Sequence, residues 1–270
     1  AFGPIPEPDL FMTDVSVCCL HVTWWAYLED HFKKPTFYMD MPATDKPDEP
    51  DYIDYYENQI HEMVKFVEAN TKCRYDEQRM KDAVKYSDLA GHYWKEIMKL
   101  RQNRPSPASF RNLAGQILPL VTFLGDKDAS DFYEALLQRY QDDVKEGKTP
   151  CKEGEKYRLI WNGIPIWHHL QIINYFEDKG ANFVWEPYTN LSWGNKTKSG
   201  RLDLARPFHT LAEKYTNVLS NRPIEDRFKY YDDAIKDYDV DGIVMFSNRS
   251  CRPMSIGQRE LVDLVKEKHD

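Results

Sequence analysis

The chain has 270 residues, with 36 lysines and arginines against 44 aspartates and glutamates, and a formal net charge of −8. This length allows one large domain or two modest ones with a sizeable core. No basic stripe occurs, which argues against nucleic acid as a partner. No apolar stretch approaches the ~18 residues of a membrane helix, and no signal peptide is visible. Five cysteines, an odd number, argue against a disulfide framework. We therefore expect a cytoplasmic protein with neither a nucleic acid nor a membrane as partner.

The first fifty residues predict a strand, a helix and a second strand. Residues 9–17 and 35–41 are β-rich, and residues 21–32 carry a helical pattern. This βαβ unit is too small to form a domain alone. We therefore interpret residues 1–50 as part of an incomplete N-terminal α/β domain whose other strands lie upstream.

Residues 51–150 predict a helical region. Apolar side chains recur at helical spacing from Tyr56 to Val67 and again from Met80 to Met98. Arg104-Pro-Ser-Pro107 interrupts the pattern, and Ser109 is placed to cap a helix that continues through Leu118. A further helix is expected to end near Gly147.

From residue 151 the pattern becomes an alternation of strands and helices. Strands are predicted at residues 157–161, 182–186 and 242–247, with helices around 169–178, 208–218 and 228–238 and a last one containing Leu261 and Val265. Such alternation is typical of a doubly wound parallel sheet. We therefore predict an α/β protein with two doubly wound parallel-sheet domains of the Rossmann or flavodoxin-like type, joined by the helical region. The C-terminal domain spans residues 151–270, and its last strand is expected beyond Asp270.

Cysteines follow two of these strands. Cys18 and Cys19 come at the turn between the first strand and its helix, and Cys251 follows the strand at 242–247. Ligands of open α/β sheets bind beyond the carboxyl ends of strands. Thiolates delivered there from two units are suited to a shared soft-metal or iron–sulfur site. Buried structural cysteines remain the alternative interpretation.

Gly163-Ile-Pro-Ile-Trp-His-His169 also follows a strand and leads into a helix. It lacks the second glycine of a phosphate-binding fingerprint. Its position suits contact with a substrate, since Trp167 offers a surface for a planar or acyl group and His168 or His169 offers a proton carrier. Helix capping and core packing are the alternative.

The order of several segments resembles one known family. The segments are Asp14-Val-Ser-Val-Cys-Cys19, Trp24-Trp25, Pro35-Thr-Phe-Tyr-Met-Asp-Met-Pro42, a long helical insert, Trp161-Asn-Gly-Ile-Pro-Ile-Trp167, Gly180-Ala-Asn-Phe-Val-Trp-Glu186 and Val240-Asp-Gly-Ile-Val-Met-Phe-Ser-Asn-Arg-Ser-Cys251. Together they resemble the benzoyl-CoA reductase / 2-hydroxyacyl-CoA dehydratase family over nearly the whole chain. The segment Trp161–Trp167 is most similar to a benzoyl-CoA reductase subunit.

The resemblance implies a metal site. In this family each large subunit holds a 4Fe-4S cluster through three cysteines, which implies Cys19 and Cys251 as ligands, with Cys18 as the alternative to Cys19. The first family ligand lies upstream of the residues shown, so the chain is a fragment or this subunit has lost its cluster. The resemblance also implies a paralogous second subunit and an ATP-hydrolysing iron–sulfur activator as partners.

The reaction implied is radical chemistry on an acyl-CoA in anaerobic metabolism, such as the degradation of aromatic compounds. We expect ATP-driven one-electron reduction of an aromatic acyl-CoA through a ketyl radical. Gly163, Trp167 and Trp185 are the expected substrate contacts and His168 the expected proton carrier, since a dry pocket is required. Three alternatives stay open: a 2-hydroxyacyl-CoA dehydratase subunit, a non-catalytic scaffold subunit, and an unrelated α/β binding module.

Overall fold

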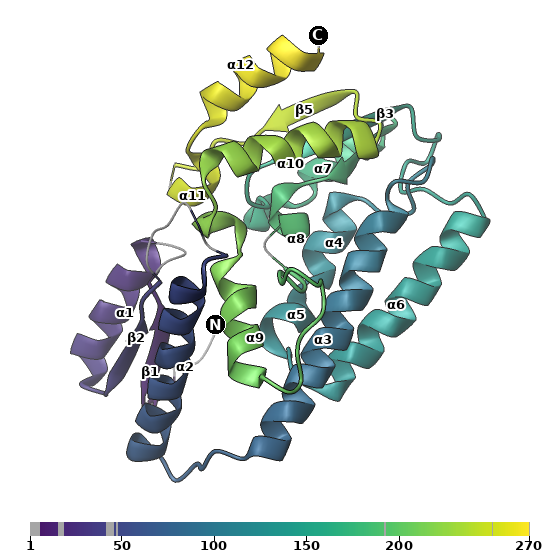
Figure 1. The fold of residues 1–270 in the computed structure, drawn as a ribbon. Coiled ribbons are helices and arrows are strands. Elements are labelled where there is room, and N and C mark those ends of the chain that lie inside the picture. Colours follow the sequence, from purple (N-terminus) through teal and green to yellow (C-terminus); the bar gives the residue numbers. More distant parts are fainter. Residues whose placement is uncertain are drawn as a thin grey trace.

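The computed structural model describes residues 6–15, 19–41, 46, 48–191, 193–249 and 251–269, except the side chains of Cys19 and Ser220. Two parallel sheets lie at opposite ends of the sequence, and helices connect and cover them (Figure 1). The small N-terminal sheet and the C-terminal sheet are separated in the chain by the helices of the middle region.

The N-terminal unit is a short βαβ element. Strand β1 (Phe11–Asp14) pairs in parallel with β2 (Thr36–Met39), and α1 (Cys19–Phe32) connects them. Helix α2 (Pro50–Asn70) packs against β2 and against α9 (Pro207–Thr216) from the C-terminal half. The hydroxyl of Tyr56 on α2 donates to the carboxylate of Asp14 at 3.0 Å. The unit is thus fastened to the rest of the protein through α2.

The middle region is built around two long helices, α3 (Glu77–Leu100) and α6 (Lys127–Lys145), which run side by side (Figure 1). Between them in the chain lie α4 (Phe110–Gln116) and α5 (Leu118–Thr122). The expected single helix through Leu118 is therefore wrong. Pro119 lacks an N–H group to continue the α4 hydrogen-bond ladder, so a new helix begins there.

The C-terminal sheet has three parallel strands in the order β4-β3-β5, namely β4 (Ala181–Trp185), β3 (Tyr157–Asn162) and β5 (Gly242–Met245). Successive side chains alternate between its faces. Trp161 and Phe183 pack with α4 and α7 (Ile172–Glu177), whereas Ile160 and Val184 pack with α10 (Ile224–Asp237) and α12 (Gln258–His269). Helices therefore cover both faces of this sheet.

A buried ion pair joins the middle region to the sheet. Arg101, which caps α3, forms two hydrogen bonds of 2.7 Å to the carboxylate of Glu186, the residue that follows β4. Both side chains are fully enclosed. The Arg101 guanidinium also donates to the carbonyl oxygen of Phe183 at 2.7 Å. This pair fixes where the chain leaves β4.

The prediction of an α/β protein with parallel sheets is confirmed. Strands β1, β2 and β5 are shorter than expected, whereas β3 and β4 lie within one residue of their expected bounds. The sequence pattern did not indicate the short helices α8 (Pro187–Leu191) and α11 (Arg252–Ser255) or the 3₁₀ turns η1 (Trp167–His169) and η2 (Leu219–Asn221). Within the described ranges, no helix has the length and apolar character of a membrane span.

Candidate active site

The strand order places a topological switch point in the C-terminal sheet. From β3 the chain passes to β4 on one side, and β5 lies on the other side of β3. In open α/β sheets, ligands bind at the carboxyl ends of the strands that flank such a point. Three segments meet this edge: the loop with Gly163 after β3, helix α8 after β4, and the loop with Cys251 after β5.

Gly163 is required by the backbone at this edge. Its φ angle is +133°, and a Cβ added there would lie 2.7 Å from the carbonyl oxygen of Phe246. The N–H of Phe246 donates to the carbonyl oxygen of Asn162 at 2.8 Å. The loops after β3 and β5 therefore run in direct contact, and only glycine allows both the φ angle and this approach.

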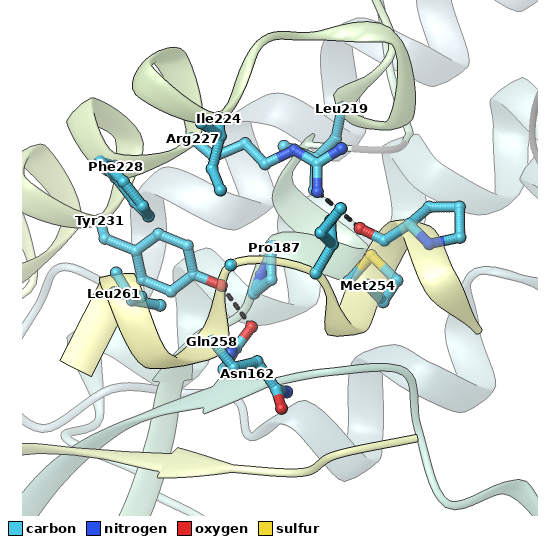
Figure 2. Close-up of a pocket in the computed structure, with 13 residues that line it drawn as sticks. Asn162, Pro187, Leu219, Ile224, Arg227, Phe228, Tyr231, Met254, Gln258 and Leu261 are labelled. Atoms are coloured by element: carbon cyan, nitrogen blue, oxygen red, sulfur yellow. Dashed lines mark hydrogen bonds between the residues drawn. The ribbon is translucent and has the colours of Figure 1, made fainter. Parts of the chain in front are cut away.

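The loop that carries Cys251 is held by three side chains. Arg227 on α10 donates to the carbonyl oxygen of Pro253 at 2.6 Å (Figure 2), and Ser255 donates to that of Asn248 at 2.6 Å. Gln258 donates to the carbonyl oxygen of Phe246 at 3.1 Å. These bonds tie both ends of the loop to α10, α11 and α12, so Cys251 sits on a braced segment.

Figure 2 shows the cavity behind this loop. Tyr231 on α10 donates a hydrogen bond to the side-chain oxygen of Asn162, at the end of β3. The cavity has a volume of about 30 Å³, far below the roughly 300 Å³ or more of a ligand pocket. It cannot enclose a substrate, and we assign it to the support of the Cys251 loop.

An aromatic row lies next to Cys251. Tyr188 on α8 packs edge-on against Trp167, with ring centroids 5.9 Å apart, and against Trp193 at 6.1 Å. Burial, with the neighbouring Cys251 thiol as the second cause, raises the pKa of Tyr188 to about 12. The phenol therefore keeps its proton at neutral pH and is a hydrogen-bond donor near a partly exposed thiol.

The other expected substrate residues differ in position. Trp167 is 49% exposed in η1, so its ring can cover a ligand, and His168 beside it is exposed. Trp185 is only 4% exposed and packs edge-on against Tyr231 with ring centroids 5.2 Å apart. Trp185 thus packs in the core next to the carboxyl end of β4. Its contact with a substrate stays a prediction.

Of the two N-terminal cysteines, the structure describes only the backbone of Cys19. Helix α1 begins at Cys19, two residues before the expected start of this helix at residue 21, so the backbone of Cys19 belongs to the helix. Cys18 and the side chain of Cys19 lie outside the described residues. Convergence of these thiols with Cys251 therefore stays a prediction.

The remaining cysteines and a carboxylate group lie elsewhere. Burial raises the pKa of Cys151 to about 11, so this thiol stays protonated, and Cys73 is exposed. Among the described side chains, one group of three metal-ligand type gathers within 4.8 Å: Asp54, Glu57 and His209. His209 already pairs with Glu57 at 2.9 Å, and we assign this group to the contact between α2 and α9.

Sequence reasoning missed Tyr188. The residue follows β4 by three positions, and the charge of Cys251, from a distant part of the chain, contributes to the raised pKa of its phenol. Its position just beyond the carboxyl end of a strand is the signal that also selected Gly163 and Cys251. Because α8 has only five residues, no hydrophobic period marks it in the sequence.

The fold and site define an α/β protein in which Cys251 follows a strand of a parallel sheet. Comparison with known proteins then assigns the family: the chain belongs to the family described as 2-hydroxyglutaryl-CoA dehydratase, D-component, whose profile matches residues 1–270. The resemblance inferred from the sequence motifs is thereby confirmed.

Curated relatives carry two kinds of name. The chain is 28% identical to a benzoyl-CoA reductase subunit of Thauera aromatica, over 98% of this chain and 63% of the relative. It is 25% identical to the (R)-2-hydroxyisocaproyl-CoA dehydratase alpha subunit of Clostridioides difficile, over 95% of this chain and 62% of the relative. It is 24% identical to the (R)-2-hydroxyglutaryl-CoA dehydratase alpha subunit of Acidaminococcus fermentans, over 93% and 51%. The chain thus spans less than two thirds of the length of these relatives.

Proposed function

We propose that the protein is a subunit of an iron–sulfur enzyme that performs one-electron chemistry on a CoA thioester. The observation that carries the proposal is Cys251, a partly exposed thiol on a braced loop at the switch point, beside the protonated phenol of Tyr188. The family, whose relatives are named as acyl-CoA dehydratase and benzoyl-CoA reductase subunits, supports it.

The names of the relatives support two reactions. The relative named benzoyl-CoA reductase supports an ATP-driven reduction of an aromatic acyl-CoA, and those named dehydratases support the elimination of water from a 2-hydroxyacyl-CoA. Both start from the same thioester group. Product analysis with benzoyl-CoA and with a 2-hydroxyacyl-CoA separates them.

One described feature at this edge of the sheet fits the binding of an iron–sulfur cluster. The Cys251 thiol is partly exposed at the switch point, and a thiolate is the usual ligand of cluster iron. A 4Fe-4S cluster held by Cys251 and Cys19, or by Cys18 in place of Cys19, supplies single electrons when bound. A hydrogen bond from Tyr188 toward the Cys251 sulfur would stabilise its negative charge, as donors to thiolate ligands do.

The other side chains would bind and shield the substrate. Trp167 presents an exposed ring beside Tyr188, which suits contact with the acyl group and exclusion of water. Gly163 lets the backbone approach closely, and Trp185 supports the edge from the core. His168, exposed in the same turn as Trp167, is the proposed proton carrier.

The wider assembly is also proposed. We infer two doubly wound α/β domains, represented by residues 1–50 and 151–270 and joined by the helical residues 51–150. A paralogous subunit and an ATP-hydrolysing iron–sulfur activator are the proposed partners, since the relatives are themselves named as subunits. A cytoplasmic location stays a prediction.

The test is anaerobic iron and sulfide analysis of the chain purified with its partner subunit. Cys251→Ser is expected to lose most of the iron bound to this subunit, whereas Cys73→Ser, which changes an exposed cysteine away from the site, is expected to keep it. Unchanged iron in Cys251→Ser would contradict the ligand assignment. An iron-free subunit in an active complex would favour the scaffold alternative.

A further inference from the structure

A second hollow, larger than the cavity of Figure 2, lies between α3, the segment after α8, and α10. Its volume is about 370 Å³. Four positively charged side chains line it: Lys95 and Lys99 on α3, Lys196 after α8, and Arg222 before α10. None of the described residues that line it is acidic, although the whole chain carries a net charge of −8. A local excess of positive charge in an acidic protein calls for a specific reason.

Two of these four cations, Lys95 and Lys196, form no ion pair among the described residues, whereas Lys99 and Arg222 do. The Lys196 ammonium donates to the carbonyl oxygen of Asn190 at 2.6 Å, and no carboxylate among the described residues lies within ion-pair distance of it or of Lys95. Burial, with the charges of Lys95 and Lys214 as further causes, lowers the pKa of Lys196 to about 8. An anion in the hollow would therefore be stabilised by charge, and would in turn raise the pKa of Lys196.

Two further donors at the hollow are buried without an acceptor. They are the indole Nε1 of Trp193 and the Nε of Arg222. Arg222 uses its terminal nitrogens on Asp48 at 3.4 Å and Asp226 at 3.3 Å, which leaves Nε available. Buried donors without partners are rare in folded proteins, and each calls for a ligand or an ordered water. Lys99 contributes least, since it pairs with Glu96 at 2.6 Å.

The hollow also has an aromatic wall and adjoins the candidate active site. Trp193 and Tyr230 line it, and the Trp193 ring packs against Tyr188, whose other neighbour is Trp167. Asn190, which lines the hollow, belongs to the same helix α8 as Tyr188. Helix α8 therefore connects the two regions, because Asn190 lines the hollow and Tyr188 packs against Trp167.

We propose that this hollow binds the phosphate groups of the CoA moiety, with the adenine against Trp193 or Tyr230. The inference rests on the proposed function and names the subsite of its substrate. Phosphate groups complement Lys95, Lys196 and Arg222, and the flexible pantetheine arm of CoA separates the phosphates from the thioester. The phosphates thus lie in the hollow while the thioester reaches Tyr188 and Cys251.

Calorimetric binding of CoA to the protein and its variants is the first test. Lys95→Gln and Lys196→Met are each expected to raise the Kd for CoA about tenfold or more, the effect of losing one hydrogen bond to a charged group. Lys179→Gln is the matched control, because Lys179 is exposed and precedes the amino end of β4. Lys95 is exposed, so this variant is expected to fold even where Lys196→Met does not. Equal Kd values for the wild type and Lys95→Gln would overturn the proposal.

Cross-linking gives a second readout that does not depend on activity. Light-activated 8-azido-CoA is expected to label the peptide containing Trp193 or that containing Tyr230, and labelling confined to other peptides would overturn the assignment. ADP carries the diphosphate without the pantetheine arm and is expected to bind more weakly than CoA. Tighter binding of ADP would assign the hollow to a free nucleotide instead.

The outcomes separate this inference from the proposed function. If CoA binds but none of the hollow variants weakens it, the subsite is wrong while the proposed reaction stands. If neither CoA nor a CoA thioester binds the subunit complex, the proposed function fails as well.

Discussion

Breaking the Arg101–Glu186 pair is expected to be among the most costly single changes in this protein. Both side chains are fully enclosed, and two hydrogen bonds of 2.7 Å join them. Glu186→Gln leaves the Arg101 charge buried without its counter-ion, which costs about 3–5 kcal/mol in such pairs. With a urea dependence of about 3 kcal/mol per molar, the unfolding midpoint falls by about 1 M or more.

The double variant Arg101→Met/Glu186→Leu tests the cause. Replacing both charges by apolar side chains removes the unpaired charge, so this variant is expected to be more stable than Glu186→Gln. Asp131→Asn is the control, because Asp131 forms a solvent-exposed pair with Lys127, and exposed pairs of this kind contribute little to stability. Urea unfolding followed by circular dichroism measures all three. A cost for Glu186→Gln no larger than that for Asp131→Asn refutes the reasoning.

Three further outcomes follow from the site and its surroundings. Trp167→Ala is expected to lower turnover while leaving the unfolding midpoint unchanged, since the ring is 49% exposed; wild-type turnover would remove it from the substrate pocket. Tyr188→Phe is expected to keep the iron content but to shift the reduction potential of the subunit, because it removes the proposed donor to the Cys251 sulfur, and an unchanged potential would count against that bond. Burial lowers the pKa of Lys214 to about 8 in the folded protein. Between pH 8 and 9.5 the unfolded chain therefore binds more protons than the folded protein. As a result, the free energy of unfolding rises with pH, by up to about 1 kcal/mol per pH unit. Denaturation of Lys214→Met across this range should show a smaller rise, and an identical rise would assign it to other groups.

The strands and long helices could be predicted because each carries a complete hydrophobic period. The C-terminal strands alternate between two helical layers, as Ile160 and Trp161 do on the two faces of β3. Short elements could not be predicted in this way. Helix α8 contains five residues and α11 contains four, too few for a helical hydrophobic period to be recognised in the sequence. Both helices also carry a proline in their first turn, and proline in a sequence is equally typical of a loop.

Candidate site residues could be proposed from the sequence where the end of one strand determines their position, but not where several segments combine. Gly163 and Cys251 each follow a single β-rich run, so position in the chain was sufficient. The proximity of Tyr188 to Cys251 depends on the strand order β4-β3-β5, which the sequence does not show. The interspersed charges suggested an ordinary acidic surface, because Lys95, Lys196 and Arg222 come together only in the folded chain.

Helix α8 connects these observations physically. Its start is fixed by Glu186 in the buried pair with Arg101. Its residue Tyr188 is influenced by the charge of Cys251, and its residue Asn190 lines the cationic hollow. A five-residue helix has little stability of its own, so its position depends on the ion pair that precedes it. Weakening that pair should therefore disturb the thiol site and the hollow together, whereas Lys95→Gln should affect the hollow alone. A Glu186 variant that alters the pKa of Tyr188 and the affinity for CoA by linked amounts would show that one buried carboxylate positions both sites.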